Sequence, residues 1–305
     1  MITEHREVVF ARRPGFRPLA LDLYVPANPQ ALCVYLHGGG WRVGSRTEGP
    51  GNVKTWKPDF FRYVASTGLA IASVDYRLSA EAQFPAQPDD VTAAIDFLAA
   101  HRADFGVTTP RTVIWGVSAG GHLAALAALT PPSRVAPGEP APVRPASGQP
   151  APVQPAPGQL APGQPAPEEP AARISAAVCW YPVTDLDALS KDIAEAGGHP
   201  DRSAESREGA FLGAALDDVP DLAAAASPVH HVHPGAPPFL FLHGDADKAV
   251  PPHQSERLAT ALRAAGAKAT VELVPGAGHM FPELDEPATR AVTDRSIRFL
   301  LDHAS

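Results

Sequence analysis

Residues 112–129, with the sequence TVIWGVSAGGHLAALAAL, are the stretch that decides the fold. The apolar run TVIW predicts a buried strand, and AGGHLAALAAL predicts a helix that begins directly after it. Ser118 would then lie on a tight strand-to-helix turn, where Gly116 and Gly120 permit a strained backbone and leave the hydroxyl exposed. The helix amino-terminus also favours developing negative charge. The pattern predicts a nucleophilic serine, and the alternative is a glycine-flanked turn whose serine has no role.

The same strand-then-helix alternation extends outward in both directions. Short apolar runs bounded by Gly, Pro or Asp predict further buried strands. They span 19–26, 31–39, 69–77, 176–183, 239–245 and 269–275. Helical spacing of apolar residues follows in 91–98, 258–265 and 286–303. Repetition of strand and helix predicts an α/β fold over 1–305, a single domain with a mainly parallel central sheet and helices on both faces.

Composition excludes several classes of protein. The chain has 305 residues, of which 45% are hydrophobic and 19% charged, so it can bury a large core. Its formal net charge is -8, and it has no run of basic residues. We therefore expect no electrostatic attraction to nucleic acid or to an anionic membrane. No apolar run reaches about 18 residues, and the opening MITEHREVVF lacks a secretory signal, so we expect a soluble, cytoplasmic protein. Cys33 and Cys179 stand among apolar residues and are expected to be buried free thiols.

Many of the 35 prolines lie in one segment, 131–170. This segment repeats with a ten-residue period, from APGEPAPVRP at 136–145 to APGQLAPGQP at 156–165. Such a composition predicts a disordered or polyproline II insertion. It could dock a proline-binding domain, but we favour a loop without function, because lengthening a loop costs little free energy. We expect deletion of 135–169 to leave catalytic turnover nearly unchanged.

A glycine-rich loop lies at the end of the strand expected at 31–39. The sequence His37-Gly38-Gly39-Gly40-Trp41 lets main-chain N–H groups approach a ligand closely and hold an oxyanion. Gly39 and Gly40, together with the N–H of Ala119, are the candidate donors, and Trp41 N–H is an alternative. We expect His37 to shape the loop rather than transfer protons. The side chain of Trp41 either lines the substrate pocket or packs in the core.

Two more loops past strand ends supply a base and an acid. HGDADKAVP spans 243–251 and PGAGH spans 275–279. Loops at the carboxyl ends of parallel strands converge on one edge of the sheet. There His279 can take the serine proton, if a carboxylate accepts its other N–H. Asp247 is the candidate acid, with Asp245 and Asp185 as rivals, and the order Ser118, Asp247, His279 suits a nucleophile-elbow hydrolase.

Taken together, these motifs carry a resemblance to a known superfamily. HGGGW, VDYRL (74–78), WGVSAGGHLAAL, WYPVTDL, HGxxD and GAGH, in this order, resemble the α/β-hydrolase superfamily. Within it the chain is similar to hormone-sensitive-lipase-like carboxylesterases and to BD-FAE-type esterases, which also resemble kynurenine formamidases. The resemblance selects Asp247 as the acid and implies a serine carboxylesterase that needs no cofactor and acts on small to medium esters. Val117 departs from the pattern, since relatives often carry Asp, Glu or His there.

Other interpretations remain open beside this one. An arylformamidase-like amidase would use the same residues, and a non-catalytic hydrolase-fold binding protein would not use them. The segment 185–238 is expected to form a small cap-like excursion over the active-site edge and to line the pocket. A metal site is not expected, because the histidines lack ligand spacing. The histidines considered were His122, His230, His231, His233 and His253.

Overall fold

The computed structural model describes residues 1–51, 53, 56–130 and 174–304, so the proline-rich repeat at 131–170 lies outside the described residues. The described chain forms one eight-stranded sheet in the order β1-β2-β4-β3-β5-β6-β7-β8. β1 and β2 pair antiparallel, β2 pairs antiparallel with β4, and the remaining neighbours are parallel. The strands are β1 (Ile2–Ala11), β2 (Leu19–Pro26), β3 (Ala31–Leu36), β4 (Leu69–Val74), β5 (Thr112–Val117), β6 (Ile174–Trp180), β7 (Phe239–Gly244) and β8 (Ala269–Val274).

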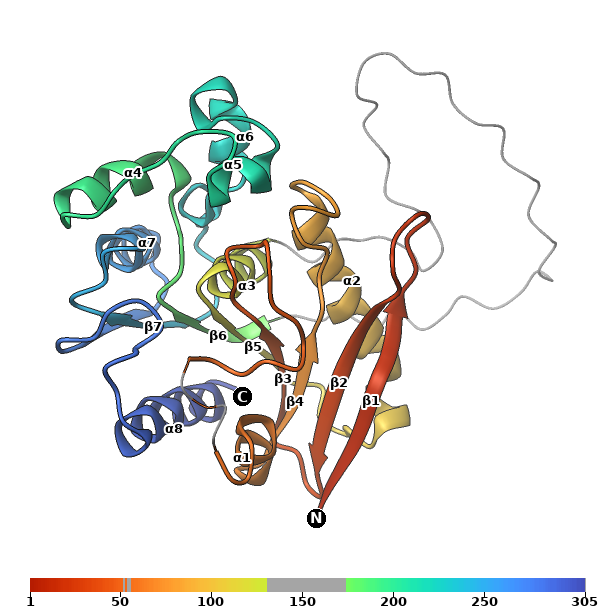
Figure 1. Ribbon diagram of the computed structural model, residues 1–305. Coiled ribbons are helices and arrows are strands. Elements are labelled where there is room, and N and C mark those ends of the chain that lie inside the picture. Colours follow the sequence, from red (N-terminus) through yellow and green to blue (C-terminus); the bar gives the residue numbers. More distant parts are fainter. Residues whose placement is uncertain (52, 54–55, 131–173, 305) are drawn as a thin grey trace.

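Helices cover both faces of this sheet (Figure 1). Helices α2, α3 and α7 pack on one face, and α1 and α8 pack on the other. The helices are α1 (Phe60–Ser66), α2 (Ala86–His101), α3 (Ala119–Leu129), α4 (Leu186–Glu195), α5 (Arg207–Leu212), α6 (Pro220–Ala225), α7 (His253–Ala264) and α8 (Glu286–Asp302). Short 3-10 helices are η2 (Arg102–Phe105), η3 (Leu216–Asp218) and η4 (Pro228–His231). The predicted fold class is confirmed.

The apolar strands separate two cores. In β3, Leu32 and Val34 face the core under α2 and α3, whereas Cys33 and Tyr35 face the core under α1 and α8. Burial on both faces explains why these strands are continuously apolar in sequence. Cys33 and Cys179 are free and fully buried on opposite faces, as predicted, and burial raises the pKa of both thiols.

β1 is the strand that the sequence patterns did not predict. Its burial alternates irregularly between partly buried and exposed positions, and it carries charged residues such as Glu4, Arg6 and Glu7. The strand forms because its backbone pairs with β2 at the edge of the sheet, which requires no apolar run.

The segment 185–238 folds into α4, α5, α6 and the two short helices η3 and η4. Figure 1 shows α4, α5 and α6 grouped at the top of the view, with α4 above α7 and with α5 and α6 above α3. A backbone hydrogen bond ties this group to the rest of the chain, because Phe84 N–H donates to the carbonyl oxygen of Phe211 in α5 at 2.8 Å. Its part in lining a substrate pocket stays a prediction. No helix in the described part of the chain has the length and apolar character needed to cross a bilayer.

Candidate active site

Ser118 occupies a strained turn between β5 and α3. Its backbone angles are φ 53° and ψ -120°, a conformation that costs free energy for a residue with a side chain. The turn is also tightly packed. A Cβ atom on Gly116 would lie 2.0 Å from the carbonyl oxygen of Gly120, and one on Gly120 would lie 2.2 Å from that of Leu36. Glycine at both positions is therefore required for the strand and helix to meet at the serine.

Three side chains from separate loops form a hydrogen-bonded series. Ser118 Oγ lies 2.9 Å from His279 Nε2, and His279 Nδ1 lies 2.7 Å from Asp247 Oδ2. Asp247 follows β7 and His279 follows β8, so the parallel sheet delivers all three groups at its carboxyl edge. The carboxylate can only accept, which places the imidazole proton on Nδ1 and leaves Nε2 to accept from the serine hydroxyl. The structure thus brings together the three residues selected from the sequence.

The carboxylate of Asp247 is buried but well supplied with donors. Burial alone would raise its pKa, yet hydrogen bonds from the side chains of His243 and His279 hold that pKa well below its usual range. The other carboxylate oxygen, Oδ1, accepts the backbone N–H groups of Ala249 and Val250, both at 2.9 Å. Asp247 is therefore ionised at neutral pH and is held in one orientation.

The glycine-rich loop passes directly beside the serine. A Cβ atom on Gly38 would lie 3.4 Å from Ser118 Cβ, and Gly39 and Gly40 follow with φ of 113° and 58°. Among the described residues, the N–H groups of Gly39 and Gly40 have no hydrogen-bond acceptor. Ala119 is the first residue of α3, where helix N–H groups have no intrahelical acceptor. The predicted donors are thus free to bind an anion next to Ser118.

Comparison with known proteins places this site in a family. Residues 21–262 match the family model described as BD-FAE. The chain belongs to the BD-FAE family. It is 31% identical to Esterase LipQ of Mycobacterium tuberculosis over 94% of this chain and 60% of the relative. Esterase LipC of the same organism is 28% identical over 93% of this chain and 63% of the relative. This BD-FAE chain therefore spans about three fifths of the length of these curated relatives.

Solved structures of esterases share the fold of this chain. A truncated carbohydrate esterase from gut microbiota superposes with a TM-score of 0.72 and 26% identity, covering 99% of this chain and 96% of that one. Esterase Est2 of Thermogutta terrifontis, with propionate bound, gives a TM-score of 0.65 and 25% identity over 96% and 92% of the two chains. These likenesses confirm the α/β-hydrolase fold expected from the sequence.

The rival acids of this BD-FAE protein are engaged elsewhere. The Asp245 carboxylate accepts the backbone N–H of Gly276 at 2.7 Å. Asp185 caps α4 by accepting the N–H of Ala188 at 3.1 Å. In the described part of the chain, Asp247 is the carboxylate that contacts the imidazole of His279.

His37 and Tyr76 support the glycine-rich loop from below. His37 is buried, its Nδ1 lies 2.7 Å from the carbonyl oxygen of Gly38, and its ring stacks on Tyr76 at 4.3 Å. The Tyr76 hydroxyl donates to the His37 carbonyl oxygen at 2.9 Å. Burial lowers the pKa of His37, so the ring stays neutral and donates from Nδ1. These contacts agree with the expectation that His37 shapes the loop.

Trp41 packs in the core in this structure. Its side chain is 1% exposed and stacks on Phe211 at 4.5 Å, while its indole N–H donates to His122 Nδ1 at 3.3 Å. The Nε2–H of His122 donates a hydrogen bond to the carbonyl oxygen of Ala226 at 2.7 Å. Of the two roles considered for the Trp41 side chain, the structure shows packing in the core. Direct contact of its ring with substrate stays a prediction. Elsewhere in the described ranges, no group of three or more His, Cys, Asp or Glu residues is placed to hold a metal ion.

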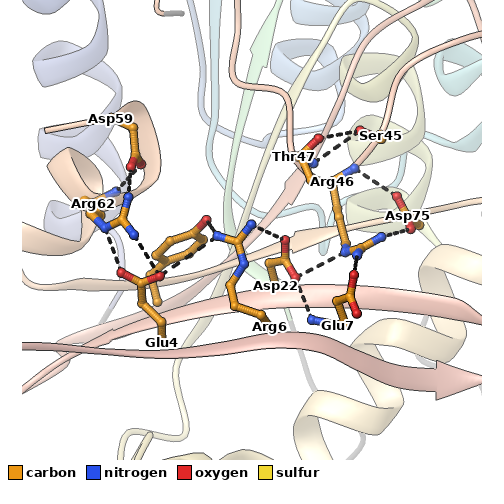
Figure 2. A network of polar contacts seen from close by, with 11 residues as sticks. Glu4, Arg6, Glu7, Asp22, Ser45, Arg46, Thr47, Asp59, Arg62 and Asp75 are labelled. Atoms are coloured by element: carbon orange, nitrogen blue, oxygen red, sulfur yellow. Dashed lines mark hydrogen bonds and ion pairs between the residues drawn. The ribbon is translucent and has the colours of Figure 1, made fainter. Parts of the chain in front are cut away.

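An arginine that the sequence patterns missed anchors the chain just beyond the glycine-rich loop (Figure 2). Arg46 inserts between two buried carboxylates, with Nη1 2.7 Å from Asp75 and Nε 3.1 Å from Asp22. Its backbone N–H also donates to Asp75 at 2.8 Å, and Glu7 accepts from Nη2 at 3.3 Å. These partners come from β1, β2 and the end of β4. No local spacing links them, so only the fold could reveal the contact.

Proposed function

We propose that the protein is a serine carboxylesterase that cleaves esters of small to medium size through an acyl-enzyme intermediate. The observation that carries the proposal is the continuous series from Ser118 Oγ through His279 to the ionised Asp247. Relatives and solved neighbours that are named esterases support the same chemistry. The mechanism needs no cofactor.

The contacts assign a role to each group. His279 Nε2 takes the proton from Ser118 Oγ as the oxygen attacks the ester carbonyl, and Asp247 stabilises the imidazolium that results. The N–H groups of Gly39, Gly40 and Ala119 bind the oxyanion of the tetrahedral intermediate. His279 then returns its proton to the departing alkoxide. Water, deprotonated by the same imidazole, releases the acid and restores the serine.

Site-directed variants test this proposal with short-chain 4-nitrophenyl esters. Ser118→Ala is expected to lower kcat by about 10⁴-fold or more. Asp247→Asn should lower it by about 10⁴-fold, since an amide cannot orient the imidazole in the same tautomer. Asp245→Asn is the matched control, because it changes a carboxylate two residues away that contacts Gly276 instead. Full activity of Ser118→Ala, or equal losses in the two aspartate variants, would contradict the assignment.

Two further measurements separate the alternatives. A fluorophosphonate probe should label the wild-type protein and not Ser118→Ala, whereas a non-catalytic binding protein would stay unlabelled. Comparing turnover of an acetate ester with that of N-formylkynurenine distinguishes an esterase from an arylformamidase-like amidase. We expect the ester to be the better substrate.

A further inference from the structure

A second histidine contacts the carboxylate of Asp247 from inside the protein. His243 is near the end of β7, and its side chain is fully buried. Its Nε2 lies 2.7 Å from the carbonyl oxygen of Val250 and 3.4 Å from Asp247 Oδ2. Its Nδ1 lies 2.7 Å from the hydroxyl of Ser255, in the first turn of α7. The imidazole therefore bridges the two ends of the 247–250 turn and the start of a helix.

The partners of His243 fix where its proton lies. A backbone carbonyl oxygen can only accept, so Nε2 must carry a proton. With the proton on Nε2, Nδ1 accepts a hydrogen bond from the hydroxyl of Ser255. The same Nε2 also lies 3.4 Å from Asp247 Oδ2, the oxygen that accepts Nδ1–H of His279 at 2.7 Å. At 3.4 Å the contact with Asp247 is longer than the bond to Val250, and it acts on the carboxylate mainly through electrostatic attraction.

We propose that His243 is a positioning residue for the proposed esterase reaction, which holds the Asp247 carboxylate in register with His279 through its Nε2–H. This inference rests on the proposed function. His243 has no route to substrate, since it lies behind Asp247 in the core, so its effect must pass through the carboxylate. The backbone N–H groups of Ala249 and Val250 fix Oδ1. The Val250 carbonyl oxygen holds the His243 ring, whose Nε2 faces Oδ2.

Losing the Nε2–H has two consequences. Oδ2 becomes free to turn away from His279, and a misplaced catalytic partner costs about tenfold or more in rate. In wild type, the N–H of His243 and the imidazolium of His279 both interact with the negative charge of Asp247. Without the N–H of His243, that charge stabilises the imidazolium more strongly. The acid limb of the kcat/KM profile therefore moves to higher pH.

Other charged or titratable groups face this site from neighbouring elements and stay constant in the test. The ring of Tyr181, after β6, lies 4.9 Å from that of His279, and burial and the charge of Asp247 raise its pKa, so it stays neutral. Glu283 accepts the N–H of Gly278 at 2.8 Å. Asp245 and Lys248 flank Asp247 in the chain.

Two amide variants form the matched test. Gln places its amide nitrogen where His carries Nε2, whereas Asn places it where His carries Nδ1. His243→Gln should therefore keep kcat within a few-fold of wild type, with the same pH profile. His243→Asn should lose about tenfold or more in kcat per folded molecule, with KM little changed and the acid limb at higher pH. The folded fraction is measured by near-ultraviolet circular dichroism.

The outcomes separate this inference from the proposed function. Equal kcat and equal pH profiles in the two variants would overturn the role of His243 while leaving the esterase proposal intact. If wild-type protein hydrolyses no ester, the proposed function itself fails. Should His243→Asn not fold, His243→Leu tests the same contact, because leucine fills part of the volume of the ring and supplies no N–H to Asp247. A few-fold loss of kcat supports the inference, and wild-type kinetics would overturn it.

Discussion

Replacing Arg46 with methionine should destabilise the fold strongly, because the change leaves two buried carboxylates without their best partner. Asp22 is 0% exposed and Asp75 is 4% exposed. Removing one partner of a buried ion pair costs about 3–5 kcal/mol. Arg6 still lies 3.1 Å from Asp22, and Arg17 still lies 3.5 Å from Asp75, so each carboxylate keeps one cation. We therefore expect the lower end of the range, about 3 kcal/mol.

Arg62→Met is the control, since Arg62 also bridges two carboxylates in the same network (Figure 2). It pairs with Glu4 and Asp59, but its side chain is 45% exposed, compared with 17% for Arg46. Exposed pairs contribute about 1 kcal/mol or less. Equilibrium unfolding in urea measures both variants against wild type. If the two substitutions cost the same free energy, burial is not what makes Arg46 important, and the reasoning is refuted.

Three other substitutions test the architecture around the site. Burial lowers the pKa of His122 to about 4, so as the pH falls this histidine is protonated in the unfolded chain before it is protonated in the folded one. The free energy of unfolding should therefore fall by about 3 kcal/mol between pH 6.5 and 4. Urea titrations measure this dependence, and His122→Gln should flatten it. Gly120→Ala forces a Cβ against the Leu36 carbonyl oxygen and should cost about 3 kcal/mol. Thermal unfolding measures this loss, and an unchanged melting temperature would contradict the tight packing of the turn. Trp41→Phe keeps the stacking on Phe211 but removes the N–H bond to His122; a loss of about 1 kcal/mol with unchanged KM supports packing, whereas a raised KM indicates substrate contact.

The sequence predicted those parts of the structure that depend on local pattern. Ser118 and His279 could be selected because each follows an apolar run, and parallel strands bring such positions to one edge. Three carboxylates met that criterion for the acid, and the family resemblance selected Asp247 among them. β1 could not be predicted in this way, since an edge strand is stabilised by its backbone partner and its side chains stay half-exposed. The role of Arg46 could not be predicted either, because its partners lie far from it in the chain.

Contacts between charges far apart in the chain leave no periodic trace. Asp22 and Asp75 lie 24 and 29 residues from Arg46, and nothing in their spacing distinguishes them from solvated surface charges. His243 is different, because it stands in the quoted HGxxD motif. Its position inside a buried strand, four residues before the acid, was the available signal.

The two cysteines give this protein a pair of internal reporters. Cys33 and Cys179 are completely buried, one on each side of the sheet, and burial raises the pKa of each thiol. A thiol-specific reagent can modify either residue only after the layer of helices covering it has opened. Under native conditions the two modification rates would therefore measure the opening free energies of the two layers separately. The stability of the helix layer on each side of the sheet can thus be measured without introducing a new cysteine or label.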